Sequence, residues 1–268
     1  MARGDRPFLL ALAILSGGYV LLIASMIGAD LSYTSLGNLG RALGSPEIRA
    51  AVKLTLWSSA VSAVLSVLVA VPAGYLLSRT RFPGKALIDA MLDIPIVLPP
   101  LVVGLSLLIL FQTSWGRAFE SRVFQVTYAV PSVILAQFSV AAAFAVRVMQ
   151  TAFNQMTPRS EQVAMTLGCS RAGAFFRVVL PEARRAVLAA YAIAWARSLG
   201  EFGPVLVFSG ATRMKTEVLS TTVFLELSVG RLEAAVAVSL LMVLISIIVL
   251  LVLGALGRRD AIERVVQG

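Results

Sequence analysis

The chain has 268 residues, of which 58% are hydrophobic and 14% are charged, and its formal net charge is +9. A soluble globular domain has about a quarter of its residues charged and under half apolar, so this composition excludes an ordinary soluble protein. Without histidine and with a single cysteine, Cys169, the sequence also excludes a disulfide framework, a His/Cys metal site and a histidine-assisted nucleophile.

The apolar residues are gathered in six blocks, each long enough to cross a hydrocarbon core, which takes about 20 residues. No segment alternates as a membrane β-barrel strand does, so the blocks are predicted to be helices. We therefore expect an all-α membrane protein with six transmembrane helices, at residues 8–28, 54–77, 86–111, 129–153, 186–208 and 234–257. The whole chain, residues 1–268, is predicted to form a single transmembrane domain.

The first block is predicted to be a retained helix. Arg3 and Arg6 precede it, as in a signal peptide, but the apolar stretch from Phe8 to Ala29 exceeds the roughly 7–15 residues of a signal core. Placing segments 1–7, 79–85, 154–185 and 258–268 inside gives thirteen basic residues inside and eight outside. The positive-inside bias therefore predicts that both termini are cytoplasmic. The net charge reflects this topology, and nucleic-acid binding is not expected because no aromatic-interleaved basic stripe is present.

Between the first two blocks, the polar segment 29–53 is predicted to contain a short helix from about Glu47 that runs into the second block. The third block carries Pro95, Pro99 and Pro100, which remove amide donors and force a break or kink. One interpretation is ordinary packing irregularity. The other is a discontinuous helix beside a translocation pathway.

Charged residues inside the third and fourth blocks have simple interpretations. Asp89 and Asp93 are expected to favour a helix N-terminus through its dipole rather than to form a catalytic pair. Arg147 lies about two turns from the predicted inside end of the fourth block, where it can snorkel to the interface. No paired acids with a substrate cleft are evident, so no catalytic residues are assigned.

The longest inside segment, residues 154–185, is predicted to hold two short helices. Thr157 and Pro158 indicate a helix start, and Gly168 a left-handed cap after about Leu167. Ser170 can cap a second helix that runs to Val179. Taken alone, such a unit with one apolar face is either a loop packed on its own protein or a docking element.

The fifth block contains Arg197 and Glu201, four residues apart on one helix face. Each charge near the midplane costs about 2.5–3.5 kcal/mol on insertion scales, so both should face the bundle interior and be partnered. They form either a structural ion pair or part of a pathway in which Arg197 assists a dianion. The outside segment 211–233 mixes both signs of charge. It is expected either to re-enter the membrane as an amphipathic element where a binding protein docks, or to form only a solvated rim.

The segment 154–185 resembles the EAA loop of binding-protein-dependent ABC importer permeases. That motif consists of Glu-Ala-Ala, three residues of any type and a glycine. Nine further residues, an isoleucine, one residue of any type and Leu-Pro follow the glycine. Gly168 is followed here by nine residues, Val178 and Leu180-Pro181, while the acid is displaced to Glu161. The resemblance extends over about residues 50–257. It implies the type I importer fold and a helix seated on a cytoplasmic ATPase, with coupling residues Glu161, Gln162, Ala164, Gly168, Leu180 and Pro181.

A second resemblance narrows the substrate. The run from Ala196 to Gly203 (ARSLGEFG) and the run from Asp93 to Gly104 (DIPIVLPPLVVG) are similar to those of molybdate, tungstate and sulfate permeases. This resemblance implies import of a small oxyanion, with Pro99, Pro100, Arg197 and Glu201 along the translocation pathway. Polyamine and iron permeases share pieces of both runs, so another small solute is the alternative.

The expected assembly follows from the family resemblance and from what the sequence lacks. No GxxxxGK[ST] phosphate loop is present, so ATP is expected to bind to separate ATPase subunits and no cofactor or metal to this chain. The other expected partners are an extracytoplasmic solute-binding protein, a second permease chain (as a homodimer) and the bilayer of the cytoplasmic (inner) membrane. A polytopic membrane enzyme would need clustered acids, histidine or cysteine, and an assembly factor would not need the spacing from Gly168 to Pro181.

Overall fold

The computed structural model describes residues 5–34 and 36–267, and within these ranges every regular element is a helix. In chain order the elements are α1 Asp5–Tyr33, α2 Leu36–Gly44, α3 Pro46–Arg79, α4 Lys85–Val97, α5 Pro100–Gln112, α6 Ser114–Arg122, α7 Val130–Gln155, α8 Arg159–Thr166, α9 Arg171–Ala174, the π-helical turn η1 Phe175–Val179, α10 Leu180–Glu182, α11 Arg184–Leu199, α12 Gly203–Ser209, α13 Leu219–Ser228 and α14 Leu232–Gln267.

Four continuous helices are long and apolar enough to cross a membrane: α1, α3, α7 and α14. A fifth candidate is the pair α4 and α5, whose axes differ by 112° across a short break. The described helices thus give four spans, or five if the bent pair is one span. The predicted count of six is not confirmed, and the cytoplasmic location of the termini stays a prediction.

The predicted fifth block, residues 186–208, does not form one continuous helix. α11 ends at Leu199, and α12 begins only at Gly203. With 16 residues, α11 is about 24 Å long, which is short of a hydrocarbon core. Gly200 ends the first helix, and Pro204 occupies the first turn of the second, where its missing amide proton carries no penalty. The hydropathy pattern alone did not predict this interruption.

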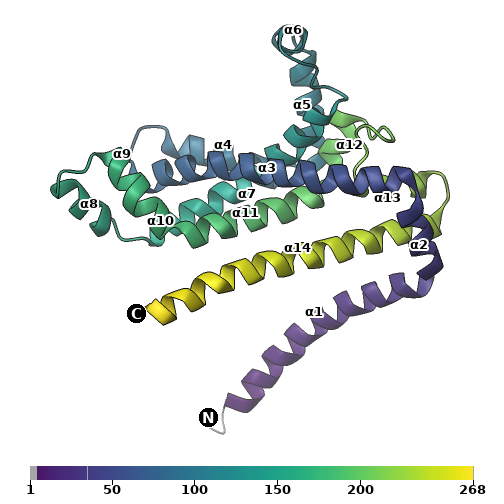
Figure 1. Cartoon of the computed structure of the whole chain (residues 1–268), viewed down its shortest axis with the longest axis horizontal. Helices are drawn as coiled ribbons and strands as arrows, with labels where there is room; N and C mark the ends of the chain where they lie inside the picture. The colour runs from purple at the N-terminus through teal and green to yellow at the C-terminus, as the bar shows by residue number, and fades with distance from the viewer. Residues whose placement is uncertain (1–4, 35, 268) are drawn as a thin grey trace.

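The segment before the second span behaves as predicted. α3 begins at Pro46, and the Ser45 hydroxyl accepts a hydrogen bond from the backbone amide of Ile48 at 3.3 Å. Serine before proline at the first helical position is a favourable helix start. The extra turns before residue 54 lengthen this helix to 34 residues, so that it runs along nearly the whole long axis of the bundle (Figure 1).

The core lies where α3, α7 and α11 pack together through small residues. An added Cβ at Gly74 of α3 would lie 2.8 Å from the Cβ of Met149 in α7. Hydrogen bonds cross the same interfaces: the Ser62 hydroxyl donates to the carbonyl oxygen of Ile134 at 3.0 Å, and the Trp195 indole donates to the Ser59 hydroxyl at 2.9 Å. Small residues and interhelical hydrogen bonds hold helices together where the surrounding lipid is as apolar as the side chains.

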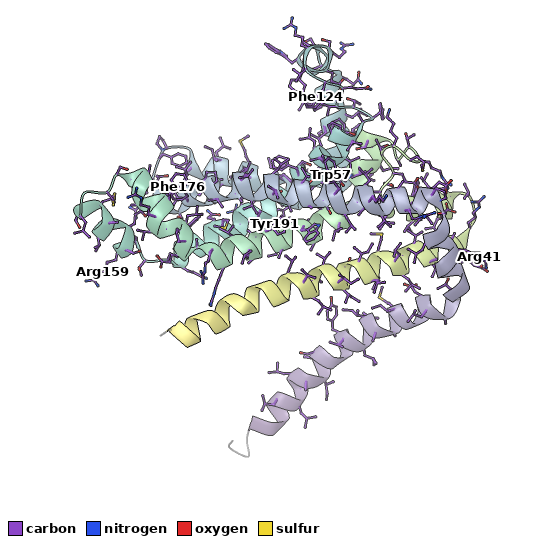
Figure 2. The ribbon with its side chains drawn as sticks, in the orientation of Figure 1. Arg41, Trp57, Phe124, Arg159, Phe176 and Tyr191 are labelled. Carbon is purple, nitrogen blue, oxygen red and sulfur yellow. The ribbon has the colours of Figure 1, made fainter. Side chains whose placement is uncertain are left out.

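The bundle has two distinct ends (Figure 1). α8 and α9 lie at one end, and α2 and α13 lie at the other. Side chains drawn on the ribbon place Arg159 and Phe176 at the α8 end and Arg41 at the opposite end (Figure 2). The start of α1 and the end of α14 point toward the α8 end, so both termini lie on the same side of the molecule. α5 and α6 stand away from the long axis.

Candidate functional site

The short-helix unit between α7 and α11 closely follows the predicted pattern. Gly168 has a positive φ of 92°, and the amide of Cys169 donates to the carbonyl oxygen of Ala164 at 3.0 Å, closing the end of α8. The Ser170 hydroxyl accepts from the amide of Gly173 at 3.1 Å, which confirms the second cap. The second helix continues past α9 as the π-helical turn η1, and Leu180 and Pro181 form α10 before the chain bends into α11.

The predicted helix start at Thr157 is wrong by one residue. Pro158 occupies the N-cap position, and α8 begins at Arg159. Pro158 has helical dihedral angles (φ −68°, ψ −3°), and its carbonyl oxygen accepts from the amide of Gln162 at 3.0 Å. The proline ring presets φ near this value, so residue 158 takes the boundary position itself.

The two faces of α8 have opposite environments. Glu161 is 4% exposed and is the one buried residue of this helix. Val163 is 51% exposed and Leu167 is 81% exposed, so these two apolar positions face away from the rest of the chain. Gln162 is exposed too, but it lines a cavity shared with Arg79 at the end of α3.

The second helix does pack on its own protein, because Val179 is buried in the core and Phe175 packs against it. In contrast, α8 leaves an apolar surface open beside a buried carboxylate. The arrangement suits a helix that receives a partner on its outer face.

The broken helices meet each other. Added Cβ atoms show how close they are: at Gly104 of α5 the new atom would lie 2.6 Å from the Cα of Pro204, and at Gly203 it would lie 3.0 Å from the amide nitrogen of Leu101 and 3.2 Å from the carbonyl carbon of Pro100. The break at Leu98 and Pro99 therefore lies against the break at residues 200–202. The predicted discontinuity of the third block is confirmed, and its neighbour is a discontinuity that hydropathy did not indicate.

Arg197 and Glu201 lie at this junction as an ion pair. Arg197 Nη1 is 2.6 Å from the Glu201 carboxylate, and the Glu201 side chain is 1% exposed. The guanidinium is also 5.8 Å from the ring centroid of Phe144 in α7. The Ser220 hydroxyl donates to the carbonyl oxygen of Glu201 at 2.8 Å, which ties the break to α13. The expected partnering of the two charges is thus present, and Glu201 faces the interior as expected, whereas the Arg197 side chain is 30% exposed.

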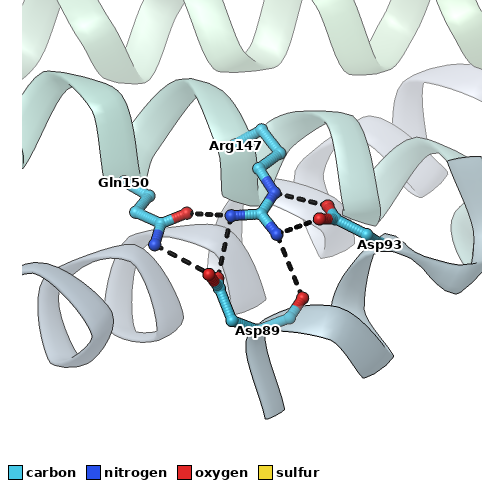
Figure 3. A network of polar contacts seen from close by, with 4 residues as sticks. All are labelled: Asp89, Asp93, Arg147 and Gln150. Atoms are coloured by element: carbon cyan, nitrogen blue, oxygen red, sulfur yellow. Dashed lines mark hydrogen bonds and ion pairs between the residues drawn. The ribbon is translucent and has the colours of Figure 1, made fainter. Parts of the chain in front are cut away.

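Arg147 is paired with acidic residues, which sequence reasoning did not predict (Figure 3). Nη1 donates to Asp89 Oδ1 at 2.8 Å, and both carboxylate oxygens of Asp93 also accept from the guanidinium. Gln150 bridges Arg147 and Asp89. The two aspartates therefore serve as partners of Arg147 and not as complements to a helix dipole, because neither lies in the first turn of α4, where the dipole acts.

The end of the bundle opposite α8 carries a cavity of about 760 Å³ lined by residues of both charge signs. Its walls come from α2, the start of α3, and the region from α13 to the start of α14. Glu226 is 6% exposed, and its carboxylate is 2.6 Å from Arg213 and 3.8 Å from Arg231. α13 packs against α14 and α3, so the expected element within residues 211–233 is a short helix closing this end.

Comparison with known proteins agrees with this architecture. Residues 70–260 match the family model of the binding-protein-dependent transport system inner membrane component. The chain is 33% identical over 242 residues to the sulfate transport system permease protein CysT of Salmonella typhimurium, covering 90% of this chain and 87% of that protein. It is 34% identical over 213 residues to the molybdenum transport system permease protein ModB of Mycobacterium tuberculosis, covering 79% and 80%.

Solved structures share the fold at low sequence identity. A chain of a bacterial alginate ABC transporter, solved in complex with an alginate pentasaccharide-bound periplasmic protein, superposes with a TM-score of 0.74 at 19% identity and 96% coverage of both chains. The fold, the matched family model and the relatives lead to one assignment. The chain belongs to the family of binding-protein-dependent transport system inner membrane components and is a multi-pass inner membrane permease subunit of an ABC importer.

Proposed function

We propose that this permease imports a small tetrahedral oxyanion of the sulfate, molybdate and tungstate class. The supporting observation is that relatives covering most of the chain are named for sulfate and molybdenum transport, and one from Thermococcus kodakarensis, 32% identical over 169 residues, for molybdate/tungstate transport. The ion pair of Arg197 and Glu201 lies in the junction of broken helices, where such permeases are expected to pass their substrate.

The charges of the apolar helices set how the anion passes. Arg147 is held by two aspartates and Arg197 by one glutamate. The cluster around Arg147 therefore carries a net negative charge and disfavours a dianion, whereas the neutral pair of Arg197 and Glu201 can lower the dielectric barrier through its guanidinium without forming a tight site. Weak binding suits a permease, because a path must release what it receives. Selectivity among anions of similar shape then belongs to the solute-binding protein that delivers them.

The substrate class is tested on the solute-binding protein encoded beside this chain. That protein is titrated calorimetrically with sulfate, molybdate and tungstate, and with spermidine and ferric ion as the competing solutes. Binding of at least one oxyanion in the micromolar range or tighter, with neither cation bound, is the expected result. Binding of spermidine or ferric ion, with no oxyanion bound, would contradict the proposed oxyanion substrate and favour the alternative of another small solute.

We further propose that α8 seats on a cytoplasmic ATPase subunit. The support is the exposed apolar face formed by Val163 and Leu167, with the acid turned inward. In a Cys169→Ser background, Leu167→Cys should cross-link to a cysteine in the helix-binding groove of the ATPase, whereas Trp57→Cys, on an exposed face of α3 within its span, should not. Cross-linking from both positions, or from neither, would contradict the proposal. The solute-binding protein is expected to dock at the opposite, charged end.

A further inference from the structure

Tyr75 joins three segments at the α8 end of the bundle. It lies in the last turns of α3, and its ring meets Phe153 of α7 edge-on with centroids 5.7 Å apart. The same ring meets Phe175 of η1 at 4.7 Å. Its hydroxyl donates a hydrogen bond to the carboxylate of Glu161 in α8. No sequence motif singles out this tyrosine, because its partners lie far along the chain.

The Glu161 carboxylate is held by two groups of α3. One is the Tyr75 hydroxyl, and the other is Arg79, whose Nε is 3.7 Å from Glu161 Oε2. Arg79 is itself 10% exposed in its side chain, and its Nη2 donates to the carbonyl oxygen of Met156, directly after α7. A buried carboxylate is tolerated only when it is paired and hydrogen-bonded. The seat of Glu161 is thus built from the ends of α3 and α7.

This seat governs the orientation of α8. The helix has eight residues, and Glu161 is the one that it buries. α8 also packs against η1 and α9, and the Ser160 hydroxyl donates to the Glu182 carboxylate of α10 at 3.2 Å; all three of these elements follow α8 in the chain. α3, in contrast, runs without interruption from Pro46 to Arg79, and its first turns line the charged cavity at the opposite end. The Glu161 seat therefore connects the proposed ATPase contact to a single continuous helix that reaches the other side of the molecule.

We infer that Tyr75 is a positioning residue for coupling: its hydroxyl, acting through Glu161, fixes α8 to α3, so that a movement of α8 on the ATPase moves α3. The inference rests on the proposed contact between α8 and the ATPase. It also assigns the displaced acid of the EAA-like loop to an internal contact. The outer face of α8, with the exposed Val163 and Leu167, is left for the partner.

The test uses the transporter assembled with its ATPase and binding protein in proteoliposomes. Tyr75→Phe keeps both ring contacts and removes only the hydroxyl, and Glu161→Gln keeps the side-chain size and removes the charge. Tyr19→Phe, on an exposed face of α1, is the matched control. The measured quantity is solute transported per ATP hydrolysed. We expect a fall of about tenfold for each of the first two variants, as for loss of a hydrogen bond to a charged acceptor, with ATP hydrolysis within about twofold of wild type.

The outcomes separate positioning from simple structural support. The double variant should show no further loss beyond the more impaired single variant, because both changes act on the same bond: Tyr75→Phe removes its donor, and Glu161→Gln replaces its charged acceptor by a neutral amide. Wild-type transport per ATP in Tyr75→Phe and Glu161→Gln, with only the amount of assembled protein reduced, would overturn the inference and leave the proposed function intact. An additive double variant would overturn it as well. Absence of ATP-driven uptake by the wild type would overturn the proposed function and this inference together.

Discussion

At the scale of single residues, the arginines within the predicted fourth and fifth blocks are paired with acidic residues. Glu201 is 1% exposed and depends on Arg197, and Arg147 depends on Asp89 and Asp93. A charged side chain in a low-dielectric interior needs a partner of opposite charge. Removing one partner lowers the free energy of unfolding more than removing both does, because it leaves an unpaired buried charge. These pairs therefore act first as structural requirements, whatever they also do for a passing anion.

Replacing Arg197 with alanine leaves the buried Glu201 carboxylate without its ion-pair partner. We expect Arg197→Ala to destabilise the protein by about 3–5 kcal/mol, and the double variant Arg197→Ala/Glu201→Ala to recover part of that loss because no unpaired charge remains. Thermal unfolding in detergent micelles measures both. A midpoint for Arg197→Ala equal to that of wild type would show that the pair carries no stability.

Gly168 tests the turn that ends α8. Its φ of 92° is in the region that favours glycine, and no neighbouring atom lies within 4 Å of an added Cβ, so the penalty for Gly168→Val is backbone strain of about 1–2 kcal/mol. Gly230→Val is the matched control, since Gly230 has a φ of 76° and equally open surroundings at the opposite end. We expect Gly168→Val, and not Gly230→Val, to uncouple ATP hydrolysis from transport in vesicles. Normal coupled transport by Gly168→Val would refute this.

At the scale of elements, the junction of broken helices is the tightest contact that the structure shows between α5 and α12. Helix propensity alone would make Gly104→Ala stabilising by up to about 1 kcal/mol. The new Cβ would instead lie 2.6 Å from the Cα of Pro204, a backbone atom that cannot rotate away. The steric contact, and not the helix propensity, should therefore decide whether Gly104→Ala stabilises or destabilises the protein.

We predict that Gly104→Ala lowers the thermal unfolding midpoint and reduces transport, because it separates the two breaks. Gly18→Ala in α1 is the control, because nothing lies within 4 Å of its added Cβ, and it should leave both quantities unchanged or raise the midpoint. The same measurement in detergent serves both variants. Equal thermal unfolding midpoints for the two alanine variants would contradict the prediction, because α5 and α12 would then be able to move apart without loss of stability.

The segment between α6 and α7 is predicted to respond to acid. Burial alone would raise the pKa of Glu120, but backbone amides hydrogen-bond its carboxylate and hold the pKa below its ordinary value. These donors are the amides of Val126, at 2.9 Å, and Thr127. Because the folded pKa is depressed, this stabilisation is present above the unfolded pKa of about 4.3 and is lost as pH falls through the folded value.

Hydrogen exchange of the amides of residues 126 and 127 measures the effect. Protection should be constant above about pH 5 and should decline below about pH 4 relative to other loops, after correction for intrinsic exchange. Glu120→Gln should lose the pH dependence, whereas Ser121→Ala, at the neighbouring position, should keep it. Protection that is independent of pH in the wild type would contradict the assigned hydrogen bonds.

Much of the helical architecture could be predicted from sequence, and the exceptions have physical reasons. Apolar length indicated the continuous spans, Pro99 and Pro100 indicated one break, and Ser45, Gly168 and Ser170 indicated local ends, because all of these are local signals. The break after Leu199 lies inside an apolar stretch. Gly200 and the Gly203-Pro204 pair are signals for a break there, but the length of the apolar stretch predicted one continuous helix.

Long-range pairing was the part that sequence reasoning could not reach. Asp89 and Asp93 are more than fifty residues from Arg147, and no pattern within either helix records the partnership. The inward face of α8 was equally hidden, because an eight-residue helix is too short for a clear periodicity. The contact of Glu161 with Tyr75 therefore emerged only from the assembled structure.

At the scale of the whole molecule, the chain has two working ends joined by long helices. One end presents the exposed apolar face of α8, and the other presents a charged cavity closed by α13. The broken helices meet between them. This division fits a permease subunit that receives solute on one side and a mechanical input on the other, with α3 extending from one end to the other (Figure 1).

The most direct test of this account is uptake of radiolabelled sulfate and molybdate by proteoliposomes. The vesicles contain this chain with its ATPase, ATP is enclosed on the side of α8, and the loaded binding protein is added outside. We predict uptake of at least one of these anions that requires both ATP and the binding protein. Uptake that persists without ATP, or no uptake of any oxyanion when another solute is transported by the same vesicles, would contradict the account.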